Sequence, residues 1–243
     1  MPLDLWPATW VAASDQSSQP LNSDQVYGTS MAVSQARRTI AGMGVEIHPA
    51  TGERFPDLAQ LLAPTKPEAP ACWCLTYRVT SAEFGALRGE DRPNRLRQLC
   101  ERDIAPGVIG YDDGVPAGWC AFGPRSEMGR LQRSRTIPRI DDKPVWSVVC
   151  FVVRAGHRRQ GMAHRLLDAA VHYARSIGVE TMEGYPVETD GARISAAFAY
   201  VGTTSLFETA GFVKVAETSS RTSGMSRWIV RLDLDPARPP AAE

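Results

Sequence analysis

The apolar positions in residues 55–102 recur at helical spacing. Four of them form one stripe: Phe55, Leu58, Leu61 and Leu62. Because Pro64 cannot continue a helix, the pattern predicts a short helix that ends before it. A second helix is expected over residues 81–102, where apolar residues are interleaved with arginines.

The period then changes to that of β-strands. Residues 107–125 contain two apolar runs joined by Asp113-Gly114, a pair typical of tight hairpin turns because glycine tolerates positive φ. Residues 130–139 are polar and favour a solvated loop or a short helix. Residues 145–153 carry no formal charge, as expected for a central strand that is covered on both faces.

Helix and strand alternate over the rest of the chain. The expected elements are a helix over residues 162–177, a strand over 179–187, a helical segment over 194–211, and an antiparallel pair over 212–218 and 225–233. This order predicts an α/β fold with a mixed central sheet flanked by helices. Residues 43–235 are expected to fold as a single domain.

The two ends of the chain differ from this domain. Residues 1–42 are rich in Ser, Gln, Ala and Asp with little periodicity, so we expect a flexible N-terminal extension. Residues 236–243 are expected to form a disordered tail.

The charge balance argues against polyanionic partners. Lys and Arg together number 27, and so do Asp and Glu. No overall positive field therefore exists to hold a nucleic acid or an anionic membrane. No apolar segment approaches the ~20 residues needed to cross a bilayer, and the first residues do not resemble a secretion signal. We expect a cytoplasmic protein.

The cysteines agree with that expectation. They number five, and three of them lie inside apolar runs, which is typical of reduced thiols. Cys72 and Cys74 are closer in sequence than the usual pairs of zinc ligands, and no second Cys/His pair follows at zinc-finger distance. We expect no metal site.

The segment 157–164, HRRQGMAH, is a basic turn between an expected strand and an expected helix. The first N–H groups of a helix have no partner inside it, and the helix dipole adds about half a positive charge, so such a turn receives phosphate or pyrophosphate. The turn lacks the G-x-x-x-x-G-K-[ST] and G-x-G-x-x-G patterns of nucleotide-binding turns. It fits [QR]-x-x-G-x-[GA], with Arg158, Gly161 and Ala163 at the fixed positions.

With this turn, the chain resembles the GNAT superfamily of acetyl-CoA-dependent N-acetyltransferases. Residues 113–122, DGVPAGWCAF, are similar to the family's central hairpin. Residues 151–167, FVVRAGHRRQGMAHRLL, are similar to its coenzyme-binding strand, turn and helix, and residues 205–215, SLFETAGFVKV, to its closing helix and strand. The resemblance implies a single GNAT-like domain with a strand-turn-helix coenzyme site. It also implies acetyl transfer from acetyl-CoA to a primary amine in a direct ternary complex, and it is compatible with a homodimer.

The resemblance also implies which residues hold the coenzyme. Three strand residues would pair with the pantetheine arm through their main chain: Phe151, Val152 and Val153. Backbone amides of the turn would hold the pyrophosphate: Arg159, Gln160, Gly161, Met162, Ala163 and His164, with Arg158 at the first fixed position. The strand residues also fit a plain core strand, and both interpretations can hold because the contacts run through the backbone.

The expected proton donor departs from the family's pattern. In the family a tyrosine often precedes the E-x-x-G-F segment and protonates the departing sulfur, but this chain has Phe207 at that position. Tyr185 and Tyr200 are the nearest substitutes in sequence, although a packed tyrosine with a satisfied hydroxyl is an alternative for each.

For the base, the resemblance favours Glu183, on the strand after the coenzyme helix. Glu188 and Asp190 come next, but their polar loop also fits solvated charges. A water relay or a base from bulk solvent stays open.

The acceptor is not defined by the sequence. Trp73, Tyr77 and Trp119 either line an apolar acceptor pocket or pack in the core. The acceptor class stays open between a small amine, an aminoglycoside-like antibiotic, an amino acid and a protein amine. A non-catalytic acyl-CoA-binding module is the alternative function, and Phe207 is the residue that favours it.

Overall fold

A computed structural model describes residues 44–234, apart from residues 65, 67, 68, 70, 193, 196 and 197. The expected extension over residues 1–42 and the expected tail over 236–243 lie outside the described residues. In the described part of the chain, no helix is both long enough and apolar enough to cross a membrane.

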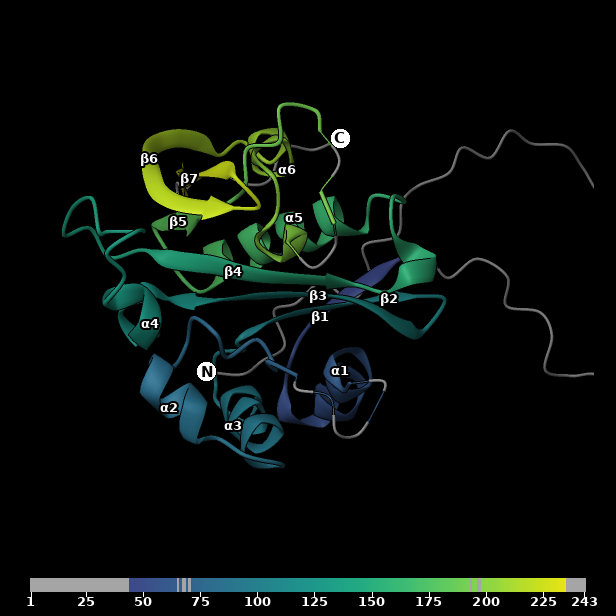
Figure 1. The fold of residues 1–243 in the computed structure, drawn as a ribbon. Helices are drawn as coiled ribbons and strands as arrows, with labels where there is room; N and C mark the ends of the chain where they lie inside the picture. Colours follow the sequence, from purple (N-terminus) through teal and green to yellow (C-terminus); the bar gives the residue numbers. More distant parts are fainter. Residues whose placement is uncertain are drawn as a thin grey trace, which may run out of the picture.

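Seven strands of the described chain form one sheet (Figure 1). In spatial order they are β1 (Glu46–Pro49), β2 (Gly107–Asp112), β3 (Val115–Pro124), β4 (Trp146–Val153), β5 (Thr181–Gly184), β7 (Met225–Asp233) and β6 (Val213–Thr222). β4 and β5 run parallel, and the other neighbouring strands run antiparallel. The expected α/β fold with a mixed sheet is confirmed.

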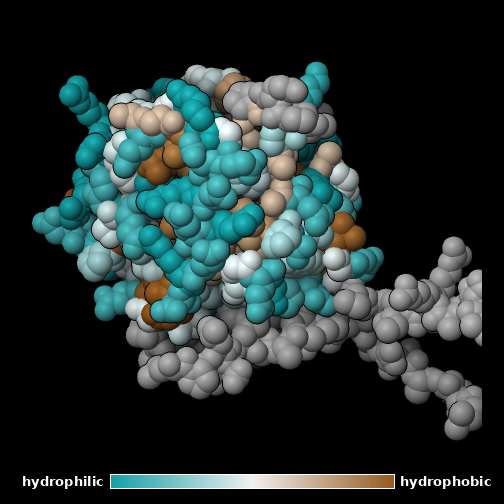
Figure 2. Space-filling model, turned by 90° about the horizontal axis from the view of Figure 1, so that it is seen from below, coloured by the Kyte–Doolittle hydropathy of each residue, from teal (hydrophilic) through white to brown (hydrophobic). Residues whose placement is uncertain are grey.

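Helices cover both faces of the sheet (Figure 1). On one face lie α1 (Phe55–Leu62), α2 (Ser81–Ala86) and α3 (Asp91–Cys100), and on the other lie α5 (Met162–Ser176) and α6 (Thr204–Thr209). The short α4 (Gly129–Gln132) follows β3. One apolar cluster includes Leu58, Leu96 and Trp119, and a second includes Phe122, Val148 and Leu166. The described surface seen from the side of α1–α3 is mostly hydrophilic (Figure 2), so the apolar faces of these helices are turned inward.

The helix expected over residues 81–102 is two helices. α2 starts after Thr80, which forms a capping box with Glu83, and it ends at Ala86. α3 starts at Asp91, after a turn in which Gly89 has a φ of +45°. A left-handed residue cannot continue a right-handed helix, so the chain breaks within the polar residues 88–95, which separate Leu87 from Leu96.

Two other elements are shorter than the sequence predicted, and one was missed. β5 ends at Gly184 rather than at residue 187, since Pro186 has no N–H to donate to a ladder. The described part of the segment 194–211 contains α6 and a 3₁₀ turn, η4 (Ala199–Val201), which are separated by Gly202 at φ +80°. β1 was not predicted, because four residues are too few to show a strand period.

Two glycines bring α5 close to the sheet. A Cβ at Gly110 on β2 would lie 2.8 Å from Met162 Sδ, and a Cβ at Gly118 on β3 would lie 2.8 Å from Met162 Cγ. Only glycine leaves room for Met162 at these points. The first turn of α5 is thereby held against β2 and β3.

Candidate active site

The parallel pairing of β4 and β5 is short. Residues Trp146–Val148 pair with Met182–Gly184. Beyond Val148, no described strand pairs with this edge of β4, although β4 pairs with β3 along its other edge up to Val153. We call the unpaired stretch, Val149–Val153 facing Tyr185–Val187, the split.

The chain itself occupies the β5 side of the split. The Val187 amide donates to Gly202 O at 3.0 Å, and the Thr204 amide donates to Val187 O at 3.0 Å. Val187 is thus paired with the segment that follows η4. On the other side of the split η4 packs near β4, but no backbone hydrogen bond joins the edge at Phe151, Val152 and Val153 to another described segment.

After Val153, β4 leads into the basic turn of residues 157–164, which we call the phosphate turn after the ligand that its sequence predicts. After a 3₁₀ turn, η3 (Ala155–His157), Arg159 has a φ of +60° and Gly161 a φ of +79°. The first bond inside α5 runs from the Arg165 amide to Gly161 O, at 3.2 Å. The amides of residues 162–164 therefore precede the helical ladder. Gly161, as N-cap, supplies no side-chain bond, and the first turn holds no acidic residue, so these donors suit an anion.

Glycine at position 161 is required by the backbone and not by crowding. A Cβ there would meet no described atom within 4 Å, but a φ of +79° is strained for other residues. Side chains of the turn are tied back to the protein: Arg158 Nε donates to Val153 O at 2.9 Å, and Gln160 Nε2 to Gly156 O at 3.1 Å. These two side chains therefore do not cover the backbone amides at the start of α5.

The carboxylate of Glu183 lies in a buried ionic network. Its Oε1 accepts from Arg125 Nη1 at 2.5 Å and from the Tyr185 hydroxyl at 2.6 Å, and its Oε2 accepts from Arg231 Nε at 2.7 Å. Glu183 is 1% exposed and Tyr185 is fully buried. Burial and the neighbouring Glu183 carboxylate raise the pKa of Tyr185 well above its ordinary value. These bonds tie the end of β5 to β7 and to the segment after β3.

Tyr200 lies beside the split in a different setting. It belongs to η4 and packs, partly buried, against the apolar cluster that contains Val149 and Cys150. Its hydroxyl is 3.5 Å from that of Tyr77, which in turn accepts from Arg227 Nη1 at 2.9 Å. Burial, chiefly, and the neighbouring Tyr77 raise the pKa of Tyr200, so its hydroxyl stays protonated near neutral pH.

Phe207 stands at the position where the family that the chain resembles often has a tyrosine. It is fully buried, and a Cβ at Gly184 would lie 2.3 Å from its Cε1. Its ring meets Phe151 and Phe212 edge-on, with centroids 6.0 and 5.0 Å apart. The position is a packed ring contact without a proton to give.

The aromatic residues predicted near the acceptor divide into two groups. Trp119 is fully buried and donates from Nε1 to Cys74 Sγ at 3.2 Å, and Trp73 stacks on Phe55 with centroids 6.4 Å apart. These two pack in or against the core. Tyr77, by contrast, reaches the split through its contact with Tyr200.

The remaining acidic candidates lie in a surface loop. Glu188 accepts from Thr204 Oγ1 at 2.8 Å and pairs with Lys214, which lowers its pKa. Asp190 is exposed at a φ of +46°. Among the described residues, no three His, Cys, Asp or Glu side chains are grouped so that they could hold a metal ion.

Sequence reasoning missed three arginines of this region: Arg125 and Arg227, which are buried, and Arg231, which is partly buried. Arg227 is 4% exposed and donates from Nε and Nη2 to Tyr185 O at 3.0 and 2.8 Å. Two of these arginines could have been recognised in the sequence as charged residues within a strand, since Arg227 and Arg231 interrupt the apolar residues of β7.

Replacing Glu183 with Gln is expected to destabilise the protein by about 3 kcal/mol, because it leaves two arginines near each other without their shared carboxylate. Thermal unfolding measures this loss. Glu217→Gln is the matched control, since Glu217 pairs with Arg221 at the surface and should change stability little. Wild-type stability combined with a collapse of activity in Glu183→Gln would instead identify Glu183 as a base.

The chain matches a known family model. The model described as "Acetyltransferase (GNAT) family" matches residues 73–198, a span that includes β2–β5, the split and the turn. One similar solved structure is an acetyltransferase of the GNAT family from Streptococcus pneumoniae, with 15% identity over 79% of this chain and 99% of that chain and a TM-score of 0.47. Another is a putative acetyltransferase from Salmonella typhimurium with its cofactor acetyl-CoA, with 19% identity over 82% and 99% of the two chains and a TM-score of 0.46. No curated protein matches the chain.

Proposed function

The chain belongs to the GNAT acetyltransferase family, and from this premise we propose that it transfers an acetyl group from acetyl-CoA to a primary amine, directly and within a ternary complex. Membership of the family supports acetyl transfer as the general activity. The observation that carries the proposal is the unpaired edge of β4 leading into a phosphate turn at the start of α5.

The coenzyme is assigned to that continuous backbone surface. The main chain of Phe151–Val153 pairs with the pantetheine arm as an added strand would. The backbone amides from Arg159 to His164 hold the pyrophosphate, and the positive end of the α5 dipole points at the pyrophosphate. Arg158 keeps the turn in place through its bond to Val153 O. The thioester then lies at the split, beside Tyr200.

Tyr200 is assigned as the proton donor to the departing sulfur. The coenzyme's thiol resembles that of cysteine, whose pKa is about 8.5, so it leaves more easily when a proton is supplied. Arg227 donates to Tyr77, and Tyr77 lies next to Tyr200. The positive charge of Arg227 therefore lies near the Tyr200 hydroxyl and stabilises it when it loses its proton. A backbone N–H on β4 stabilises the oxyanion that forms when the amine attacks.

The base is assigned to water rather than to a carboxylate. Glu183 is surrounded by Arg125, Arg231 and Tyr185, and the three bonds they donate occupy its oxygens. Proton removal by water or bulk solvent needs no further side chain at the split. The protein supplies chiefly the position of the two substrates.

Release of coenzyme A thiol from acetyl-CoA, measured across a panel of primary amines, tests this function. We expect amine-dependent release, and initial rates with both substrates varied should give intersecting lines, as a ternary complex requires. Binding of acetyl-CoA without release by any amine would favour the non-catalytic acyl-CoA-binding module, for which Phe207 is the supporting observation. A cytoplasmic location and a homodimer stay predictions.

A further inference from the structure

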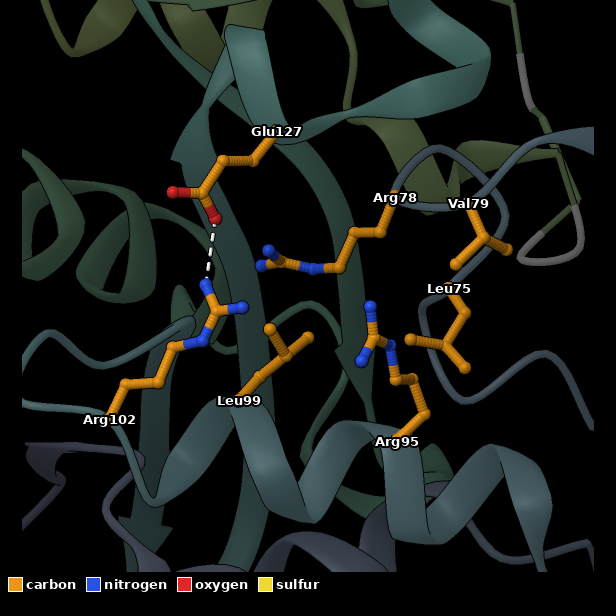
Figure 3. A pocket seen from close by; sticks show the side chains of 7 residues that line it. All are labelled: Leu75, Arg78, Val79, Arg95, Leu99, Arg102 and Glu127. Carbon is orange, nitrogen blue, oxygen red and sulfur yellow. Dashed lines mark hydrogen bonds and ion pairs between the residues drawn. The ribbon is translucent and has the colours of Figure 1, made fainter. Parts of the chain in front are cut away.

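A polar cavity lies away from the split. It has a volume of about 250 Å³ and is lined by Leu75, Arg78, Val79, Arg95, Leu99, Arg102 and Glu127. The residues come from the segment before α2, from α3 and its end, and from the 3₁₀ turn η2 (Arg125–Glu127) after β3. Figure 3 shows the guanidinium groups of the three arginines converging on this space.

The cavity and the phosphate turn lie at opposite ends of β4. η2 follows Pro124, which pairs with Trp146 at the start of β4, whereas the turn follows Val153 at its end. β4 has 8 residues, so at ~3.3 Å per residue its ends are about 20 Å apart. The coenzyme's pyrophosphate on the turn does not reach the cavity.

The cavity is also separate from the split. Cys74 Sγ lies 3.1 Å from Cys150 Sγ in the core beneath β4, and Tyr77 reaches Tyr200 beside the split, so these two residues turn toward β4 and η4. Leu75 and Arg78, which alternate with them along the same segment, line the cavity instead. The segment 74–79 thus separates the cavity on one side from β4 and the split on the other.

The charges of the cavity are not balanced within the described protein. Arg102 Nη1 pairs with Glu127 at 2.8 Å. Arg78 donates from Nη2 to two carbonyls, Pro106 O at 2.7 Å and Phe122 O at 2.9 Å, and its buried Nε has no partner among the described residues. Arg95 reaches only the neutral Gln98 side chain, at 3.4 Å. Two of the three guanidiniums therefore lack an ion-paired carboxylate within the described chain, and the lining has a net charge of +2.

The uncharged part of the lining is apolar. Leu75 is fully buried, and Val79 and Leu99 are each 8% exposed. A guanidinium is matched by a carboxylate, which accepts two parallel bonds from its fork. A ligand that satisfies the lining has two carboxylates for the arginines and a short hydrocarbon body for the exposed parts of Val79 and Leu99.

We propose that this cavity is a binding site for a small dicarboxylic acid, distinct from the coenzyme and acetyl-transfer sites. One carboxylate pairs with Arg78, the other with Arg95, and the hydrocarbon body covers Val79 and Leu99. Glu127 competes for Arg102 and limits the affinity.

Calorimetric titration of the full chain with glutarate tests the proposal. We expect saturable binding at one site, weakened about tenfold in Arg95→Ala, because one charge-assisted contact is lost. Arg95 is exposed, so its replacement leaves the fold intact. Glu127→Gln should bind glutarate more tightly, since the competing carboxylate is removed. Gly161→Asp should bind it as the wild type does, since the turn is not involved.

Arg97→Ala is the matched control. Arg97 lies on the same helix and is exposed, but its guanidinium stacks over Phe55 at 4.7 Å, outside the cavity lining. Its removal should not change glutarate affinity. Absence of saturable binding at millimolar glutarate, an equal loss in Arg97→Ala, or equal binding of the neutral glutaramide would each overturn the proposal. Inorganic phosphate binding as tightly as glutarate would overturn the assignment to an organic acid.

Discussion

Gly161→Asp is expected to weaken acetyl-CoA binding by a hundredfold or more. The new carboxylate would face the pyrophosphate across the first turn of α5, where the amides of residues 162–164 precede the helical ladder. Two like charges about 4 Å apart repel by about 4 kcal/mol at an effective dielectric constant of 20, before salt screening. Isothermal calorimetry with acetyl-CoA measures the change in Kd.

Two variants separate charge from backbone strain in this experiment. Gly161→Asn has nearly the same shape as Gly161→Asp and tolerates positive φ, but it lacks the charge, so its loss of affinity should be much smaller. Gly178→Asp places the same carboxylate at a φ of +77° just beyond the other end of α5, and it should bind acetyl-CoA as the wild type does. Equal affinities of Gly161→Asp and the wild type would exclude the turn as the pyrophosphate site.

Tyr200→Phe is expected to lower kcat about a hundredfold while leaving the Kd of acetyl-CoA nearly unchanged. Loss of a positioned acid costs on the order of a hundredfold or more in rate. The ring of Tyr200 remains packed against the apolar cluster that contains Val149 and Cys150, so only the proton is lost. Steady-state thiol release measures kcat. Because the pKa of Tyr200 is raised, kcat should not fall through its ionisation between pH 7 and 9.

The matched control is Tyr111→Phe, which also removes a tyrosine hydroxyl next to the α1–α3 layer. The Tyr111 hydroxyl donates to Asp57 Oδ2 at 2.9 Å, so its loss should affect stability and leave kcat intact. Tyr77→Phe should lower kcat by about tenfold, since it interrupts the contact between Arg227 and Tyr200. Wild-type kcat in Tyr200→Phe would remove Tyr200 from the reaction.

The parts of the fold that sequence patterns predicted are local ones. The uncharged run that became β4, the basic turn after it and the amphipathic α5 are contiguous in sequence, and their periods and the position of Gly161 suffice to predict a strand, a turn and a helix. The pattern alone also predicted the hairpin of β2 and β3, because Asp113-Gly114 adopts positive φ at both positions.

The parts that could not be predicted depend on distant residues. The two arginine partners of Glu183 are Arg125, 58 positions earlier, and Arg231, 48 positions later. No local pattern signals such a network, so the sequence suggested Glu183 as a base and could not show its two arginine partners. The pairing of Val187 with Gly202 is likewise a tertiary contact, and it decides which edge of the split stays available.

Calorimetric titration of the purified chain with acetyl-CoA tests the central claim most directly. Saturable binding of one acetyl-CoA per chain, competed by coenzyme A and weakened in Gly161→Asp, is the result that the unpaired edge of β4 and the turn at α5 predict. No saturable binding would contradict the assignment of this strand, turn and helix as a coenzyme site, and the proposed acetyl transfer would be rejected with it.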